Sequence, residues 1–600
     1  MSVRLASVAA AVALALTACS QPETGTAAEP QNTAKTAIDV NALADQYFED
    51  NLKLNPCMGV YIGDYRFNDQ YCVQSPAHFQ AQRDLTARYL AKLAKIDAKA
   101  LSQDQHTTYE LLSFDLNLAK DGERFPNEEL PLNQFYNDFA SFAQLGSGTS
   151  AQPFATVADY DAFLKKVAGF SENAGFEMAA MKAGMAKGVV LPKILAKRLV
   201  EQLSAVLADN PEDSLFWGPV KQMPAGFSDA DKARLTAAYK AAIATQILPA
   251  YQQMRDFIRD QYLPACRDSD GWSGLPDGKA WYDWEIRSQT TQTEMSSDQI
   301  HQLGLQLVDQ IHGEMAKVQK ELGIKGDLHD LFHFMQTDPS EYFKTPEEAL
   351  QAFRDVKAKV YAKLPTLFDT MPKSDYEIRA TEKFRAANSA AGEYQPGTPD
   401  GSRKGVFYAN IYNLSVQPKY GVTTLSLHEA APGHHFQISL QMEQSGQSKY
   451  RQFTGYNAYV EGWALYSETL GKNMGLYQDP NQYYGHLSDA LLRAMRLVVD
   501  TGLHAKGWSH DQAIAYMRAN SSMSIDDIRS EVERYMALPG QALGYMLGRR
   551  EIEKLRDEAK AELGDKFDIR AFHHQVLGIG AVPLEVLAEH IHSWIKSQKA

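Results

Sequence analysis

Three histidines and a glutamate lie within the eight residues 428–435, and these residue types are well suited to metal chemistry. His428 and Glu429 open the segment, and His434 and His435 close it. A neutral imidazole is a good zinc ligand, and a neighbouring carboxylate can take a proton from a zinc-bound water. The sequence therefore predicts one zinc ion per chain, with His428 as a ligand and Glu429 as the general base.

The spacing of the histidines departs from the usual zinc-helix pattern HExxH, in which the two histidines lie one turn apart. Pro432 occupies the fourth position after His428, and His434 follows two residues later. Six residues of an undistorted helix rise about 9 Å, which is too far for both side chains to reach one ion. Because Pro432 breaks helical hydrogen bonding and Gly433 tolerates unusual backbone angles, we predict a two-residue bulge within the zinc helix.

Such a bulge leaves two candidates for the second ligand, His434 and His435. Neighbouring residues on a helix point about 100° apart, so normally only one of them can face the ion. We favour His434, since a glycine often precedes the second histidine of the usual motif and Gly433 precedes it here. His435 is then expected to support the metal site or to bind substrate.

A third ligand is expected from the next helix, which we predict over residues 457–471. Glu461 lies in this segment, 27 residues after His434. Val460, Trp463 and Leu465 flank Glu461 and argue against full exposure, and a buried glutamate needs a partner such as a metal ion. A surface acid on an amphipathic helix is the plainer alternative.

Several motifs resemble known families. The segment EGWALYSE (461–468) resembles the EGFAxYxE segment of zinc aminopeptidases, in which the first glutamate binds zinc. The order HE…GH…E is similar to that of thimet-oligopeptidase-like enzymes and carboxypeptidase Taq. With HEAAPGHH, LLRAMRLVVDTGLHAKGW (491–508) and PGQALGYMLGRREI (539–552), the chain is identified as a member of the bacterial domain of unknown function 885 family. The resemblance implies a zincin-like peptidase of the glutamate-ligand type (gluzincin).

Two residues are candidates to assist the chemistry. Tyr545 lies in a segment similar to one of carboxypeptidase Taq, and a tyrosine can stabilise the oxyanion of a tetrahedral intermediate. His504 is the second candidate, because Asp500 precedes it by one helical turn and the two could pair. Core packing is the plainer alternative for both.

Other residues are candidates for substrate binding. A guanidinium fork suits a peptide carboxylate, and Arg549 follows Tyr545 by one turn. The other arginine candidates are Arg493, Arg496, Arg529 and Arg550. Residues 407–427 are expected to contain one or two strands beside the cleft, with Tyr412 pointing toward an extended peptide.

Helical patterns dominate the remaining chain, which predicts a mainly α-helical, zincin-like body with a small β element beside the active-site cleft. The predicted helices are 159–208, 229–262, 294–322, 345–364, 485–507 and 549–563. We expect a single body over 37–600, in which 37–400 forms a cleft and 401–600 carries the zinc site.

The N-terminus resembles a bacterial lipoprotein signal over residues 1–18, with Cys19 as the lipidated residue. Residues 19–36 are rich in Gln, Pro, Thr and Ala and predict a flexible tether. The protein is therefore expected at the cell envelope, facing the periplasm and held to the membrane only by lipid. In that oxidising compartment Cys57 and Cys72 are candidates for a disulfide.

The formal charge of −14 argues against a nucleic-acid partner, so a peptide substrate is the expected partner. The leading hypothesis is a zinc metallopeptidase. A zinc amidase acting on a non-peptide or cell-wall amide is an alternative, because amide hydrolysis makes the same chemical demands. The third hypothesis is a catalytically inactive, peptide-binding lipoprotein.

Overall fold

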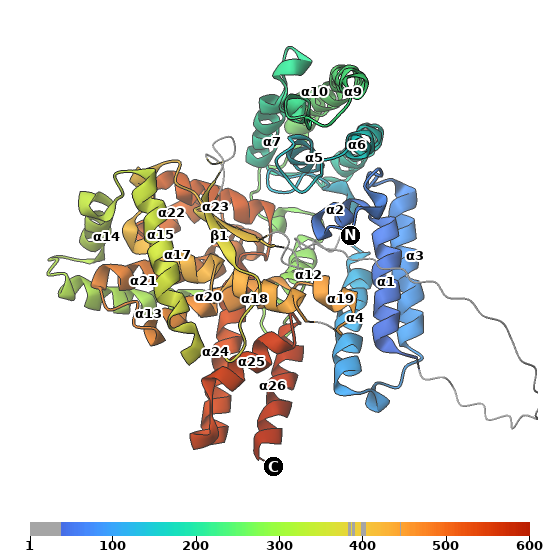
Figure 1. Cartoon of the computed structure of the whole chain (residues 1–600). Helices are drawn as coiled ribbons and strands as arrows, with labels where there is room; N and C mark the ends of the chain where they lie inside the picture. Colours follow the sequence, from blue (N-terminus) through green and yellow to red (C-terminus); the bar gives the residue numbers. More distant parts are fainter. Residues whose placement is uncertain (1–37, 382–385, 387–389, 398–403, 445, 600) are drawn as a thin grey trace, which may run out of the picture.

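The computed structural model describes residues 38–381, 386, 390–397, 404–444 and 446–599, and the protein is mainly helical (Figure 1). The predicted signal at 1–18, the modification site Cys19 and the tether at 19–36 lie outside these residues. Among the helices of the described part, none combines the length and apolarity needed to cross a bilayer.

The first helices lie at the right of Figure 1 and pack against the C-terminal part of the chain. They are α1 (Val40–Leu54), α2 (Cys57–Ile62), α3 (Pro76–Leu93) and α4 (Gln103–Gly122). Phe48 of α1 stacks on Phe453, with 5.7 Å between ring centroids. Cys57 and Cys72 form a disulfide, which confirms the predicted pairing, and Cys266 is free and buried.

A second group of helices forms its own aromatic core at the top of Figure 1. It comprises α5 (Asp138–Gly146), α6 (Val157–Lys187), α7 (Lys193–Val206), α8 (Gly218–Lys221), α9 (Asp229–Ala242), α10 (Leu248–Phe257) and α11 (Leu263–Ala265). The helix predicted over 159–208 is broken into α6 and α7, because Gly188 ends α6 in the left-handed conformation at φ 74°. Two π-helical segments join α9, α10 and α11, so the helix predicted over 229–262 is nearly continuous.

The following helices flank the C-terminal part. They are α12 (Gly278–Thr290), α13 (Ser297–Glu321), α14 (Leu328–Thr337) and α15 (Pro346–Tyr361). The long helix α13 packs along α21 (Pro480–Lys506). Gly304 makes this close approach possible, since a Cβ there would press against Leu497 and Val498 of α21.

A small three-stranded sheet is formed by the residues between α15 and the C-terminal helices. Its strands are β1 (Tyr376–Ala380), β2 (Gly392–Gln395) and β3 (Gly405–Ala409), in the order β1-β3-β2. The central strand β3 is buried, parallel to β1 and antiparallel to β2. Of the predicted strand region 407–427, only the start is a strand, because residues from Val422 onward form a buried helix.

The remaining helices form the C-terminal part. They are α17 (Val422–Glu429), α18 (His434–Met442), α19 (Lys449–Phe453), α20 (Asn457–Asn473), α21, α22 (His510–Asn520), α23 (Ile525–Ala537), α24 (Leu543–Leu563), α25 (Ile569–Gly578) and α26 (Leu584–Lys599). Helices α20 and α24 cross at Gly462 and Gly548, where a Cβ on Gly548 would collide with the carbonyl of Ala458. This close crossing positions side chains of α24 beside those of α20.

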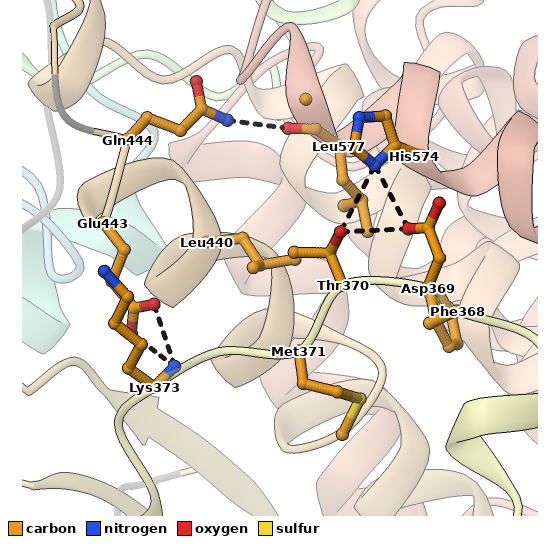
Figure 2. Close-up of a pocket in the computed structure, with 11 residues that line it drawn as sticks. Phe368, Asp369, Thr370, Met371, Lys373, Leu440, Glu443, Gln444, His574 and Leu577 are labelled. Atoms are coloured by element: carbon orange, nitrogen blue, oxygen red, sulfur yellow. Dashed lines mark hydrogen bonds and ion pairs between the residues drawn. The ribbon is translucent and has the colours of Figure 1, made fainter.

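A surface pocket of about 340 Å³ lies between α18, α25 and the segment after α15 (Figure 2). Phe368, Leu440 and Leu577 contribute apolar walls. At one side His574 Nδ1 lies 3.1 Å from Asp369 Oδ1. None of His428, His434 and Glu461 lines this pocket.

Candidate metal centre

The segment that carries the histidines forms two helices rather than one bulged helix. Helix α17 ends at Glu429, and α18 begins at His434. Ala430 has non-helical backbone angles of φ −108° and ψ −113°, and Pro432 follows a cis peptide bond. The prediction of a two-residue bulge within a continuous helix is therefore corrected to a break of the helix.

Two contacts hold the connection between α17 and α18 in place. A Cβ on Gly433 would collide with the carbonyl oxygens of Leu427 and His428, so only glycine allows the chain to fold back this closely. The indole Nε1 of Trp463 donates a hydrogen bond of 2.8 Å to the carbonyl oxygen of Pro432. These contacts hold the start of α18 close to the end of α17 and to α20.

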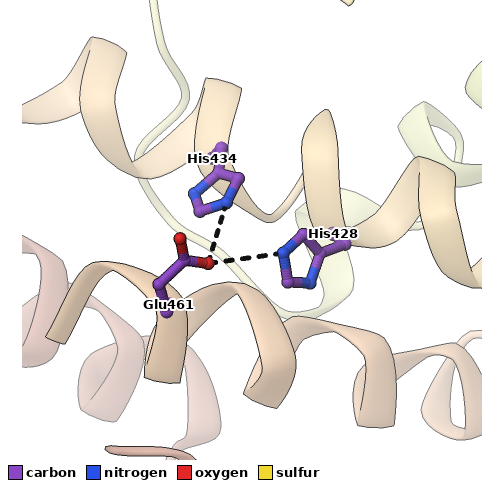
Figure 3. Close-up of side chains that lie close together, drawn as sticks. All are labelled: His428, His434 and Glu461. Carbon is purple, nitrogen blue, oxygen red and sulfur yellow. Dashed lines mark ion pairs between the residues drawn. The ribbon is translucent and has the colours of Figure 1, made fainter. Parts of the chain in front are cut away.

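His428, His434 and Glu461 converge from three helices (Figure 3). Their ligand atoms all lie within 4.8 Å of one another. Glu461 Oε2 lies 3.5 Å from His428 Nε2 and 3.3 Å from His434 Nε2. Tetrahedral zinc with bonds of about 2.1 Å separates its ligand atoms by about 3.4 Å, which matches both distances.

The electrostatics of this cluster favour a cation. Glu461 Oε2 is buried and has no hydrogen-bond partner among the described residues. Burial by itself would raise the pKa of Glu461, but His434 and His428 hold it well below its ordinary value. Burial would lower the pKa of His428, yet Glu461 and Glu468 raise it to about 10. The carboxylates therefore stabilise positive charge between them, and the two-nitrogen, one-oxygen donor set fits zinc.

Glu468 contacts the ring nitrogen of His428 that faces away from Glu461. Its Oε1 lies 2.8 Å from His428 Nδ1, and its side chain is fully buried. A carboxylate at Nδ1 keeps a proton on that nitrogen, so in the neutral ring Nε2, on the side of Glu461, carries the lone pair that can bind a metal. Sequence analysis assigned Glu468 no function, although it closes the EGWALYSE segment two turns after Glu461, on the same face of α20.

His435 points away from the cluster and toward the sheet. Its Nδ1 lies 2.9 Å from the hydroxyl of Tyr394, and its ring packs on Tyr376 at 4.7 Å between centroids. The side chain is fully buried, and burial lowers its pKa to about 3. The structure therefore brings His434 to Glu461 and does not present His435 to a substrate, in contrast to the predicted substrate-binding role.

Glu429 and Tyr545 lie next to His428. Glu429 follows His428 directly in the chain, and its charge raises the pKa of His428. The ring of Tyr545 stacks against His428 at 6.4 Å between centroids. The Tyr545 hydroxyl accepts hydrogen bonds from Arg534 at 3.1 Å and Gln541 at 3.4 Å, which leaves its own proton free to donate.

His504 lies elsewhere, in the helical core. Its Nδ1 accepts a hydrogen bond of 3.0 Å from the backbone of Trp272, and its Nε2 lies 3.0 Å from the carbonyl oxygen of Tyr535. Asp500 does not pair with it but accepts hydrogen bonds from Tyr282 and from the backbone of Gly540. Because both ring nitrogens are used in buried structural contacts, the predicted catalytic role and Asp–His pair are corrected to a structural role.

We expect His504 to make the protein sensitive to acid. Burial lowers its pKa to about 3, below the ordinary value of 6.5. The unfolded chain therefore binds a proton as the pH falls below about 6.5 while the folded chain does not, so stability is lost at up to about 1.4 kcal/mol per pH unit. The thermal unfolding midpoint, measured from pH 7 to 4.5, should fall less steeply in His504→Gln than in the unmodified protein.

The remaining predicted substrate contacts lie outside the cluster. Tyr412 follows β3 and is 63 % exposed. It lies beyond the end of the strand, so it is not part of the strand that was predicted to point it toward an extended peptide. Arg549 donates from Nε to Glu553, one turn further along α24, at 3.0 Å. Sequence analysis thus located the cluster of His428, His434 and Glu461 better than the candidate substrate contacts.

Fold and site together define a mainly helical protein in which two short helices and a third, longer one bring two histidines and a glutamate together. Residues 56–591 match the family described as bacterial protein of unknown function (DUF885), and the chain belongs to this family. No curated protein matches the chain.

The solved structures that are similar to it include two proteins described as lipoproteins. The "putative lipoprotein" from Colwellia psychrerythraea has 28 % identity and a TM-score of 0.87, with 93 % of this chain and 99 % of that chain covered. A second structure, a "putative lipoprotein of unknown function" from Shewanella oneidensis, has 20 % identity and a TM-score of 0.72 and covers 92 % of this chain and 99 % of its own. The second likeness concerns the fold alone.

Proposed function

We propose that the protein is a zinc-dependent metallopeptidase that hydrolyses peptides at the bacterial cell envelope. The observation that carries the proposal is the convergence of His428, His434 and Glu461 at zinc-like separations. Three protein ligands leave a position open for water or substrate, as catalytic zinc sites require. The position of the buried Glu461 Oε2 between His428 and His434 supports the same proposal, because a buried carboxylate needs a counter-charge and a cation held by these three residues would supply it.

In this proposal, Glu429, Tyr545 and Glu468 each have a separate role in amide hydrolysis. Zinc, when bound, would polarise the scissile carbonyl and make water more acidic. Glu429 would take a proton from the attacking water and deliver it to the leaving amine. Tyr545 would donate its free hydroxyl proton in a hydrogen bond to the oxygen that becomes negative. Glu468 would fix the orientation of His428.

The proposed location rests on the N-terminal sequence and on the relatives. Residues 1–19 resemble a lipoprotein signal with Cys19 as the modified residue. Both similar structures carry the description lipoprotein. A lipid-anchored protein facing the periplasm would meet peptides there.

Metal removal and readdition test the proposed activity. The purified protein should contain one zinc per chain and hydrolyse short peptides, and a chelator should abolish turnover until zinc is restored. Hydrolysis of cell-wall muropeptides without hydrolysis of any linear peptide would favour the amidase. Tight peptide binding by the zinc-loaded protein without turnover of either class would favour the inactive binding protein.

Replacement of Glu468 should weaken zinc binding while leaving all three ligands in place. In Glu468→Gln, the negative charge at His428 Nδ1 is lost but a hydrogen-bond acceptor remains. Loss of such a supporting carboxylate typically costs about 10- to 100-fold in metal affinity. Competition with a chromophoric chelator measures this change, and Glu562→Gln on the exposed end of α24 is a matched control. Unchanged zinc affinity in Glu468→Gln would contradict the assigned role.

A further inference from the structure

Two guanidinium groups, one buried and one partly exposed, contact Tyr545 next to the candidate metal centre. The guanidinium carbon of Arg496, from α21, lies 4.6 Å from the centroid of the Tyr545 ring. Arg534, from α23, donates a hydrogen bond of 3.1 Å to the Tyr545 hydroxyl. The same ring stacks on His428, so a single side chain separates the arginines from the metal cluster.

The charges of these arginines are incompletely balanced. Arg496 donates to Glu531 at 2.9 Å, and Arg534 Nη1 lies 3.6 Å from the same carboxylate. Within the described part of the chain, Glu531 is the one acid that forms an ion pair with either of them. Arginine remains protonated in proteins, so two positive charges share one negative charge. An excess of one positive charge is costly to bury unless an anion joins it.

The hydrogen-bonding capacity of Arg496 is also incompletely used. Its side chain is 4 % exposed, and its Nη1 has no hydrogen-bond partner among the described residues. Nearby side chains retain contact with solvent: the exposed fraction is 23 % for Arg534, 12 % for His434 and 20 % for Glu461. Solvent therefore reaches Arg534, one of the two arginines, as well as His434 and Glu461 of the cluster.

Other arginines near the site have acidic partners of their own, although Arg493 Nε and Arg549 Nη1, like Arg496 Nη1, are buried without a hydrogen-bond partner among the described residues. Arg493 donates to Asp489 at 2.9 Å and lies 3.9 Å from Glu468. Arg549 pairs with Glu553. The excess positive charge is thus associated with Arg496 and Arg534, and not with the whole set of arginines that sequence analysis named.

We propose that Arg496 and Arg534 form a subsite for a carboxylate of the substrate, so that the preferred substrates are peptides with a carboxylate close to the scissile amide bond. The proposal rests on the proposed peptidase function and specifies its substrate class. A single carboxylate matches the single excess charge, and a guanidinium group binds a carboxylate through two parallel hydrogen bonds. The carboxylate belongs either to the C-terminus of the peptide or to an acidic side chain.

Peptide selectivity tests the subsite and separates these two sources. The zinc-loaded protein is given tetra-alanine with a free C-terminus, its C-terminal amide, and amides in which glutamate replaces each alanine in turn. We expect kcat/KM to be about 10- to 100-fold higher for a peptide that carries the recognised carboxylate than for the uncharged amide. A preference for the free acid identifies the C-terminus, and a preference for one glutamate amide identifies the side chain.

Variants of the two arginines show whether they cause the preference. Arg534→Gln should reduce the ratio of kcat/KM values between acid and amide to near one. Arg496→Lys, which keeps the charge but loses the fork, should lower the ratio without removing the partner of Glu531. Arg529→Gln removes an exposed arginine from the same helix as Arg534 and should keep the full ratio. Equal hydrolysis of all peptides, or an unchanged ratio in Arg534→Gln, would overturn the subsite while leaving the peptidase proposal intact.

If no peptide is hydrolysed, the proposed peptidase function is wrong, but the carboxylate subsite can still be tested by a binding measurement. Calorimetry with the zinc-loaded Glu429→Gln protein compares the same free acid and amides without turnover. Tighter binding of the acid or of one glutamate amide, lost in a further Arg534→Gln replacement, supports the subsite. Equal binding of all of them contradicts it.

Discussion

Glu429→Gln should lower kcat for peptide hydrolysis by about 10²- to 10⁴-fold, the usual contribution of a general acid–base residue. Glutamine has nearly the same shape as glutamate but cannot accept a proton from water or pass one to the leaving amine. Glu429 is not one of the three clustered ligand residues, so the variant should still bind one zinc per chain. Steady-state kinetics and metal analysis on the same sample measure both properties.

Glu558→Gln is a suitable control for this comparison. Glu558 lies on α24, and its carboxylate pairs at the surface with His592. The control should keep both its zinc and its turnover, because an exposed ion pair contributes little. Full peptidase activity in a zinc-loaded Glu429→Gln protein would refute the assignment of Glu429 as the base.

The second large effect concerns the two adjacent histidines. His434→Asn should lose stoichiometric zinc, because His434 Nε2 faces Glu461 at 3.3 Å. His435→Asn should retain zinc, because His435 faces Tyr394 on the other side of α18 and asparagine can keep that hydrogen bond. Both variants make the same chemical replacement at neighbouring positions, so each is the matched control of the other.

Zinc content after dialysis against metal-free buffer distinguishes the two variants. Circular dichroism should show that both remain folded, since loss of a folded structure would also remove the metal. Zinc retained by His434→Asn and lost from His435→Asn would mean that the ligand assignment is shifted by one residue.

Sequence patterns identified most of the cluster because its chemistry depends on residue type and order. His428, His434 and Glu461 were predicted together, and the structure brings them together. The path between the histidines was not predictable, because Pro432 and Gly433 are compatible with either a bulge or a break. The hydrogen bond from Trp463 to the carbonyl oxygen of Pro432, which holds the connection at the break, comes from another helix and is a tertiary feature.

The surroundings of the site were harder to predict. Asp500 and His504 lie one turn apart and look like a pair, but each finds a closer partner on another helix. The excess positive charge arises because Arg496 of α21 and Arg534 of α23 share one carboxylate, that of Glu531. Sequence spacing within a helix contains no information about partners that other elements supply, so these relations appear only in three dimensions.

The secondary structure was also predictable only in part. Long helices such as α13 and α21 were predicted within a few residues, because helical periodicity is strong in long segments. Residues 422–429 contain Val422, Thr423 and Thr424, which favour strands, yet they form a buried helix packed against α20. Tertiary packing outweighs local preference in this segment, and it determines the position of His428.

Anomalous X-ray diffraction from crystals of the zinc-loaded protein, recorded on both sides of the zinc absorption edge, tests the central claim most directly. The account predicts one strong peak per chain, about 2.0 to 2.2 Å from His428 Nε2, His434 Nε2 and a carboxylate oxygen of Glu461. A peak ligated by other residues, or no zinc at this cluster in a protein that is active as a peptidase, would contradict it.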